Sequence, residues 1–150
     1  MRISTKGRYG LRILLDLALY PQTGQPRLLR DIAESQGISE KYLSRLIIRL
    51  RKADLVHSVR GAHGGYRLAR DPSQISLLDI IEVMEGPIGI VECVGSSSDP
   101  CERQESCAVR GIWESINSVI REALAQVSLQ QIIERQKELN EDGQCWNYCF

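Results

Sequence analysis

Signals for a membrane or for secretion are missing from this chain of 150 residues. It has no run of 18 apolar residues, so a helix that crosses a membrane is excluded. Its first residues lack the apolar core of a secretory signal, and we therefore expect a cytoplasmic location and no membrane partner. Cysteines in that reducing compartment rarely form a disulfide framework, which directs attention to metal or redox chemistry.

The marks of a redox enzyme and of a repeat protein are missing as well. No Cys-x-x-Cys pair follows a strand, and neither a βαβ pattern nor an internal repeat occurs. With 43% hydrophobic and 25% charged residues, the composition is that of a globular protein. The chain therefore suits one ordinary domain, or a small domain with an arm, and we do not expect an enzyme.

The two halves of the chain differ in charge, although the net charge is zero. Residues 1–71 hold fourteen Lys and Arg against six Asp and Glu, a balance of +8. The remaining residues hold five against thirteen, a balance of −8. A basic half joined to an acidic half favours a polyanion such as nucleic acid on one side only. The alternative is a solvated, charge-segregated surface.

Three segments, residues 4–20, 28–36 and 40–52, carry apolar residues at helical spacing. Gly37 is suited to end the second of these helices, and Ser39 is suited to begin the third. Two short helices joined by a tight turn form a helix-turn-helix, whose second helix enters the major groove of DNA. A plain helical hairpin has the same pattern. The polar side of the third helix holds Lys41, Ser44, Arg45 and Arg49.

A β-hairpin is predicted directly after these helices. Residues 55–59 and 66–69 read as short strands, and the turn at 60–65 is rich in glycine and positive charge. A hairpin in this position is a wing, and its glycines allow the tip to approach a DNA backbone closely. Arg60 and Arg67 are then placed to reach phosphates or a narrow minor groove. A surface hairpin with incidental arginines is the alternative.

The C-terminal half combines a long loop with an apolar helix face. Residues 75–85 predict a helix with a Ser-x-x-Asp start, and residues 88–107 a loop of a length that is usually functional or disordered. Residues 112–127 carry a continuous apolar stripe, which predicts a dimer seam unless it packs on its own domain. A short closing helix is expected to end near residue 133. The stripe consists of Ile112, Trp113, Ile116, Val119, Ile120, Ala123, Leu124 and Val127.

Three cysteines, Cys93, Cys101 and Cys107, lie in the long loop in the spacing Cys-x7-Cys-x5-Cys. Thiolates bind zinc, copper(I) and iron–sulfur clusters. Structural zinc sites pair their ligands two to four residues apart, and the three loop cysteines contain no such pair, so their spacing favours a cluster over a single ion. Three free thiols are the alternative. The fourth ligand stays open among Glu40, Asp99, Glu102, Glu105 and a group of a partner subunit.

Two further cysteines, Cys145 and Cys149, lie in the tail. Their separation from the triplet leaves three possibilities open: inert thiols, a redox pair, or thiols that approach the loop.

Four motifs together resemble one family of bacterial regulators. Residues 1–10 read MRISTKGRYG, residues 37–43 contain Gly-Ile-Ser and Tyr-Leu, residues 58–68 read SVRGAHGGYRL, and residues 85–88 read EGPI. Over about residues 1–133 the chain resembles the winged-helix regulators that include IscR, NsrR and CymR. The resemblance implies a mainly α fold with a small β wing, that is, a winged helix-turn-helix domain followed by a long dimerisation helix.

The resemblance also implies a division of the chain and a set of DNA contacts. The winged domain would span residues 1–86, the cysteine loop 87–108, the dimerisation and closing helices 109–133, and the tail 134–150. A homodimer would bind palindromic, double-stranded promoter DNA. The candidate DNA-binding residues are Lys6, Arg8, Ser39, Lys41, Tyr42, Ser44, Arg45, Arg49, Arg60, His63, Tyr66 and Arg67.

In the cluster-bearing members of this family, the three loop cysteines hold a 2Fe–2S or a 4Fe–4S cluster. The resemblance therefore assigns Cys93, Cys101 and Cys107 to an iron–sulfur cluster, with 2Fe–2S favoured. Arg110 stands where enteric IscR-like proteins have a histidine ligand, and Arg8 where NsrR-like proteins have an aspartate, so the fourth ligand is open. CymR-like members lack these three cysteines. The resemblance to them implies an alternative function, that of a cluster-free repressor of cysteine metabolism controlled by thiol state or a partner protein.

Overall fold

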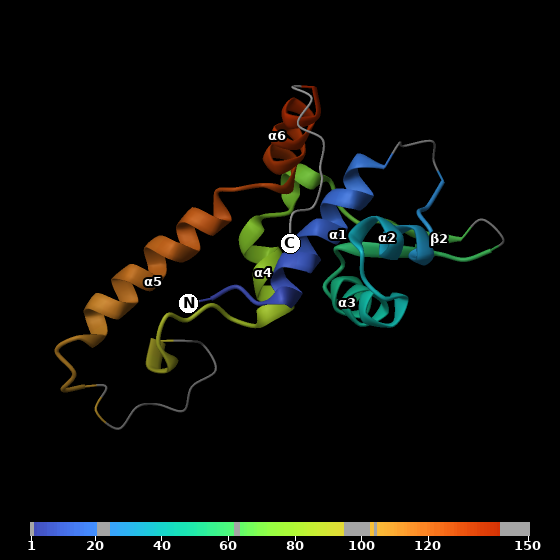
Figure 1. Cartoon of the computed structure of the whole chain (residues 1–150). Helices are drawn as coiled ribbons and strands as arrows, with labels where there is room; N and C mark the ends of the chain where they lie inside the picture. Colours follow the sequence, from blue (N-terminus) through green and yellow to red (C-terminus); the bar gives the residue numbers. More distant parts are fainter. Residues whose placement is uncertain (1, 21–24, 62–63, 95–102, 104, 142–150) are drawn as a thin grey trace.

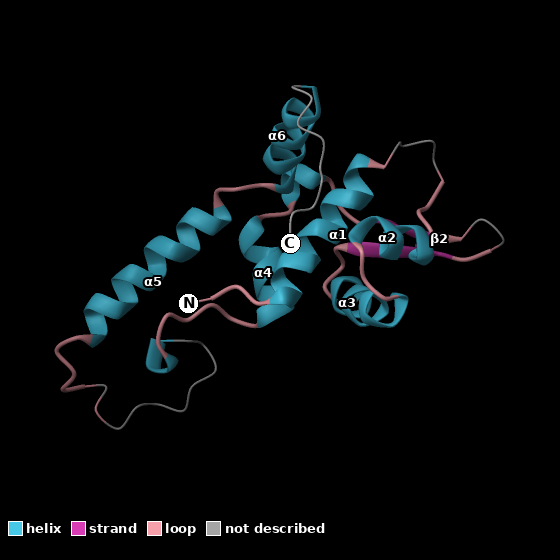
Figure 2. Ribbon diagram, in the orientation of Figure 1, coloured by secondary structure: helices cyan, strands magenta, loops and turns pink. Residues whose placement is uncertain are grey.

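The computed structural model describes residues 2–20, 25–61, 64–94, 103 and 105–141. This part of the chain is mainly helical with one two-stranded antiparallel sheet, as predicted (Figure 2). The helices are α1 (Thr5–Leu19), α2 (Leu29–Gln36), α3 (Glu40–Lys52), α4 (Leu77–Glu85), α5 (Arg110–Ala125) and α6 (Leu129–Glu141). The strands are β1 (Val56–Val59) and β2 (Gly65–Leu68), and two 3-10 turns are η1 (Pro72–Gln74) and η2 (Glu92–Val94).

Serine side chains cap the first turns of α1, α3, α4 and α6; in α6 the Gln131 amide donates to the Ser128 hydroxyl at 3.2 Å. The Ser4 hydroxyl accepts a hydrogen bond from the Lys6 amide at the start of α1, and Ser39 does the same for Tyr42 in α3. Ser76 forms a complete capping box with Asp79 in α4. Each cap satisfies an amide that the first turn of a helix leaves unpaired. The predicted starts at Ser39 and Ser76 are therefore confirmed.

The hydrophobic core surrounds α1, and the C-terminal helix α6 contributes to it as well as the N-terminal helices. Helix α1 packs against α2, α3, α4 and α6. Two glycines permit the close approach to α4. A Cβ on Gly7 would lie 2.6 Å from Oε1 of Glu85, and a Cβ on Gly10 would lie 2.5 Å from Cγ of Met84. Burial of apolar side chains here is the main contribution to stability. The fully buried members of the core include Ile13, Leu14, Ile32, Leu43, Leu50, Leu55, Ile75, Ile80, Met84 and Leu129.

The predicted hairpin is present, and it has an additional neighbour. Strands β1 and β2 pair antiparallel, with Val56 opposite Leu68 and Val59 opposite Gly65. The segment before α2 also pairs with β2, because the Arg27 amide donates to the Tyr66 carbonyl at 2.9 Å and the Arg27 carbonyl accepts from the Tyr66 amide at 2.8 Å. The sequence did not reveal this second pairing of β2, since Arg27 stands alone without strand periodicity around it.

Helix α6 is longer than expected. It continues to Glu141 instead of closing near residue 133. Ile133 and Gln136 are buried, and Gln136 donates to Asn140 at 2.9 Å one turn further on. The polar residues that read as a tail are good helix formers, and their pairs at a spacing of three or four residues support the helix.

Helix α5 lies apart from the core (Figure 1). It contacts α4 and η2, and Asn117 is its only buried residue. Val119 is 64% exposed and Ile112 58%, so the alternative, in which the stripe packs on its own domain, does not hold for these two residues. In the described part of the chain, no helix has the length and hydropathy that crossing a membrane requires.

Candidate nucleic-acid interface and cysteine segment

Helix α3 presents the polar face that the sequence predicted. Its apolar residues Leu43, Leu46, Ile47 and Leu50 are buried in the core. Lys41 and Arg45 are exposed on the other side, and Ser44 is half-buried between them. Ser39 is occupied in capping the helix. The face carries the positive charge and hydrogen-bonding groups with which a helix reads the major groove.

Two of the candidate residues on α3 have partners within the chain. The Arg49 guanidinium donates to the Met84 carbonyl at 3.2 Å, in the last turn of α4. The Tyr42 ring meets Tyr9 of α1 edge to face, with 6.0 Å between the ring centroids. Arg49 therefore holds α3 against α4, and Tyr42 holds it against α1, so both residues have a structural role within the chain.

The wing presents two arginines to solvent. Arg60 directly follows β1, Arg67 lies within β2, and both are exposed. Tyr66 is half-buried and packs against the core, so its ring anchors the hairpin. Gly65 has a φ of 156°, and a Cβ there would lie 2.4 Å from the Arg27 carbonyl oxygen, so the turn requires glycine. His63 is outside the described residues.

The first turn of α1 is tied to the end of α4. One oxygen of Glu85 accepts hydrogen bonds from the Ser4 amide at 3.1 Å, the Ser4 hydroxyl at 2.6 Å and the Gly7 amide at 3.0 Å. Burial by itself raises the pKa of Glu85, but these hydrogen bonds and the charge of Lys6 together lower it below its usual value. The candidate residues Lys6 and Arg8 lie in this turn, where Arg8 is exposed and Lys6 half-buried.

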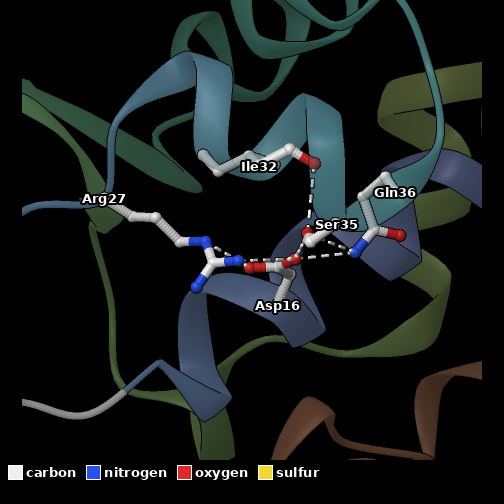
Figure 3. A network of polar contacts seen from close by, with 5 residues as sticks. All are labelled: Asp16, Arg27, Ile32, Ser35 and Gln36. Carbon is white, nitrogen blue, oxygen red and sulfur yellow. Dashed lines mark hydrogen bonds and ion pairs between the residues drawn. The ribbon is translucent and has the colours of Figure 1, made fainter.

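A polar network that the sequence analysis missed lies between α1 and α2 (Figure 3). Asp16 of α1 forms an ion pair with Arg27 at 2.7 Å and accepts hydrogen bonds from Ser35 and Gln36 of α2. The Asp16 side chain is only 7% exposed. A signal was present in the sequence, because Asp16 interrupts the apolar run Leu14-Leu15-x-Leu17. Such an acid at a buried position needs a partner.

The first part of the cysteine loop is held between two helices. The Ile88 amide donates to Glu82 of α4, and the Ile90 amide donates to Asn117 of α5, each at 3.3 Å. Glu82 also pairs with Arg121 of α5. Residues 88–90 therefore connect α4 to α5 immediately before Cys93.

The structure describes two of the three candidate cluster ligands. Cys93 in η2 and Cys107 just before α5 are free thiols and half-buried. Cys101 is outside the described residues, as are Asp99 and Glu102. Within the described residues, no three side chains of His, Cys, Asp or Glu gather closely enough to hold a metal ion. Arg110, which follows Cys107, forms an ion pair with Glu114 at 2.7 Å.

Comparison with known proteins agrees with this architecture. The model of the Rrf2 family, described as an iron-dependent transcriptional regulator, matches residues 3–135. The chain belongs to the Rrf2 family. The predicted resemblance is thus confirmed, and the relatives are transcriptional regulators rather than enzymes.

Similar Rrf2 proteins carry two different names. The HTH-type transcriptional regulator IscR of Xenorhabdus nematophila is 38% identical over 140 residues, covering 93% of this chain and 84% of its own. The solved structure of T. potens IscR has a TM-score of 0.71 at 40% identity, covering 92% of this chain and 90% of the other. The structure of CymR, the global cysteine regulator of B. subtilis, has a TM-score of 0.70 at 40% identity, covering 90% and 98%. Their shared winged-helix architecture confirms the fold.

Proposed function

We propose that this Rrf2 chain is a homodimeric regulator that binds palindromic promoter DNA and senses through an iron–sulfur cluster. DNA binding and transcriptional regulation follow from the family. The finer assignment depends on one observation: two free thiols at the ends of a loop whose first residues are bonded to both α4 and α5.

The DNA contacts divide between two grooves. Lys41, Ser44 and Arg45 on α3 face the major groove, where arginine and lysine recognise guanine edges. Arg60 enters the minor groove, and Arg67 contacts the backbone beside it. Lys6 and Arg8 in the first turn of α1 contact phosphates. The +8 balance of residues 1–71 supplies the electrostatic attraction that such contacts share.

The dimer forms through α5. Its exposed stripe includes Ile112, Trp113, Ile116 and Val119, which in a single chain leaves a large apolar face in water. A second copy of the same helix covers that face with matching residues, as a two-fold interface requires. Two recognition helices are then presented to the two halves of a palindrome.

The donor chemistry fits an iron–sulfur cluster. Cys93 and Cys107 are free, half-buried thiols, and Cys101 completes the set of three; thiolate sulfur is the ligand such clusters use. A 2Fe–2S cluster is favoured. When bound, the cluster supplies a redox-sensitive crosslink between the two ends of the loop. The chain's own contribution is mechanical, because Glu82 and Asn117 bond to the residues that lead into Cys93.

Regulation then depends on the placement of α5. The start of the loop is hydrogen-bonded to both α4 and α5, so each loop conformation goes with one arrangement of these two helices. A ligand that favours one loop conformation therefore increases the population of the matching helix arrangement. Since α5 joins the two copies, a change in its placement alters the spacing between the recognition helices. DNA affinity follows that spacing.

The second candidate function is a cluster-free regulator of cysteine metabolism. The likeness to CymR favours it, and so does Arg110, because a guanidinium stands where a histidine ligand would be needed. In that case thiol state or a partner protein controls the same DNA-binding surface.

One experiment separates the two candidates. The protein is purified without oxygen, its visible spectrum is recorded, and iron and acid-labile sulfide are counted per chain. Charge-transfer absorption with equal iron and sulfide is expected for the wild type, and Cys93→Ala and Cys107→Ala should abolish it while the far-ultraviolet circular dichroism is unchanged. A colourless protein after attempted reconstitution, still bound to DNA, would establish the cluster-free regulator instead.

A further inference from the structure

We infer that the buried Asp16–Arg27 pair sets the spacing between the recognition helix α3 and the wing. Its function is to position two DNA-contacting elements for simultaneous entry into adjacent grooves. Neither residue contacts DNA in this assignment. The inference rests on the proposed contacts of α3 and of Arg60, and it concerns how these contacts are kept in register.

Arg27 connects to the wing through its backbone. Its amide and carbonyl both pair with Tyr66 of β2, at 2.9 and 2.8 Å. Gly65 lies directly against the Arg27 carbonyl, where a Cβ would be 2.4 Å away. The residues that precede Arg67 are therefore bonded to Arg27, and any displacement of Arg27 moves β2 with it.

The Arg27 side chain connects the same residue to α1. Its guanidinium pairs with Asp16 at 2.7 Å and lies over the Tyr20 ring at 4.7 Å from the centroid. The Arg27 side chain is 17% exposed, so solvent screens the pair only weakly. A buried pair of this kind adds little net stability, but the close ion pair and the hydrogen bond that Arg27 donates to Asp16 at 3.5 Å select one geometry, which is the use proposed for the pair here.

From Asp16 the contacts continue to the recognition helix. Asp16 accepts a hydrogen bond from Gln36 at 2.7 Å, and Gln36 accepts one from Arg12 at 3.0 Å. The Arg12 guanidinium lies 4.9 Å from the centroid of the Tyr9 ring, which meets Tyr42 of α3 edge to face. Figure 3 shows the central part of this path, with Arg27 and Gln36 reaching Asp16 from opposite sides.

Simultaneous binding in two grooves makes this spacing important. If the wing and α3 are held in the binding geometry before DNA arrives, the entropy of ordering them is not lost on binding. If the wing is free to tilt, Arg60 contributes less, although α3 still binds. The pair therefore affects affinity through the wing alone, which distinguishes positioning from a general loss of stability.

The test is a mutant cycle on DNA affinity. The probe is a palindromic duplex selected by the wild-type protein from a random pool, with affinity measured by fluorescence anisotropy. Asp16→Asn combined with Arg27→Gln neutralises both charges together, so no unpaired charge is left buried. The cycle combines this pair variant with the wing variant Arg60→Ala/Arg67→Ala. The control is Arg135→Gln with Glu138→Gln, which removes an exposed ion pair on α6 without changing the net charge.

We expect the pair variant to weaken binding about 10-fold in the wild-type background and less than about 2-fold in the wing variant, because there is no wing contact left to misplace. Minor-groove protection in a hydroxyl-radical footprint should be lost while major-groove protection remains. The control pair should leave affinity unchanged. If the pair variant does not fold, Arg27→Lys is measured in the same cycle. Lysine keeps the positive charge but lacks the planar guanidinium group, whose N–H donors have a fixed geometry.

Two results overturn the inference in different ways. Equal losses of affinity in both backgrounds mean that the pair is only structural, with the proposed DNA contacts intact. A wing variant that binds as tightly as the wild type refutes the proposed wing contact itself, and the positioning role with it.

Discussion

The Glu85 carboxylate shows how one residue stabilises a helix to which it does not belong. Its oxygen accepts three hydrogen bonds at the start of α1, where the helix dipole favours negative charge. Glu85→Gln keeps an acceptor oxygen but removes the charge. We expect it to lower the free energy of unfolding at neutral pH by about 0.3–1 kcal/mol, measured by urea denaturation.

The pH dependence of that loss has a definite sign. Because the pKa of Glu85 is lowered in the folded protein, the stabilisation from its carboxylate is fully present above the ordinary pKa that it has in the unfolded chain, and is lost as the pH falls through the lowered pKa of the folded state. The difference between the wild type and Glu85→Gln should therefore vanish in strong acid. Glu141→Gln, at the exposed end of α6, is the control. Identical behaviour of the two variants across this range would contradict the assigned bonds.

Two helical glycines have opposite expected responses to alanine. A Cβ on Gly10 would lie 2.5 Å from the buried Met84, so Gly10→Ala should cost about 1–3 kcal/mol of stability despite alanine's better helix propensity. A Cβ on Gly111 of α5 meets nothing within 4 Å, so Gly111→Ala should raise stability by up to about 1 kcal/mol. Thermal unfolding of both variants measures the signs. Destabilisation of equal size in both would show that packing against α4 is not the cause.

At the scale of elements, α5 gives the sharpest prediction. Val119 is 64% exposed within its exposed stripe, and Val119→Lys would place two charges in a two-fold seam. We expect the dimer dissociation constant to rise at least about tenfold, with the mass seen in analytical ultracentrifugation moving toward the single-chain 16.9 kDa. Ser118→Lys, on the opposite side of the helix, is the control. A dimer unaffected by Val119→Lys would place the seam elsewhere.

The elements themselves were largely predictable from local signals. Ser39, Ser76 and Gly37 mark helix ends through backbone hydrogen bonds that depend only on nearby residues. The extension of α6 was not predicted, because its polar residues lack a clear apolar period and only packing shows that Gln136 is buried. The pairing of Arg27 with β2 was missed for a similar reason, since a single bridge leaves no periodic pattern.

At the scale of the whole molecule, the candidate site depends on contacts between residues far apart in the chain. The sequence predicted which face of α3 is polar, because helical periodicity decides it. It did not predict that Arg49 bonds to Met84 or that Asp16, Arg27 and Gln36 meet, since these pairings arise only after the helices pack. The three cysteines were identifiable by residue type and spacing. Their arrangement in space stays a prediction.

The last turn of α4 bonds to three partners at once: Arg49 of α3 through Met84, the start of α1 through Glu85, and α5 through Glu82. Two of these partners belong to the DNA-binding face, and the third leads to the cysteine loop. Thermodynamic linkage is reciprocal, so if a ligand of the loop changes operator affinity by some factor, the operator changes the affinity for that ligand by the same factor. A promoter-bound dimer and a free dimer then differ in their affinity for the ligand. The number of operators in a cell therefore helps to determine the ligand concentration at which the regulator responds.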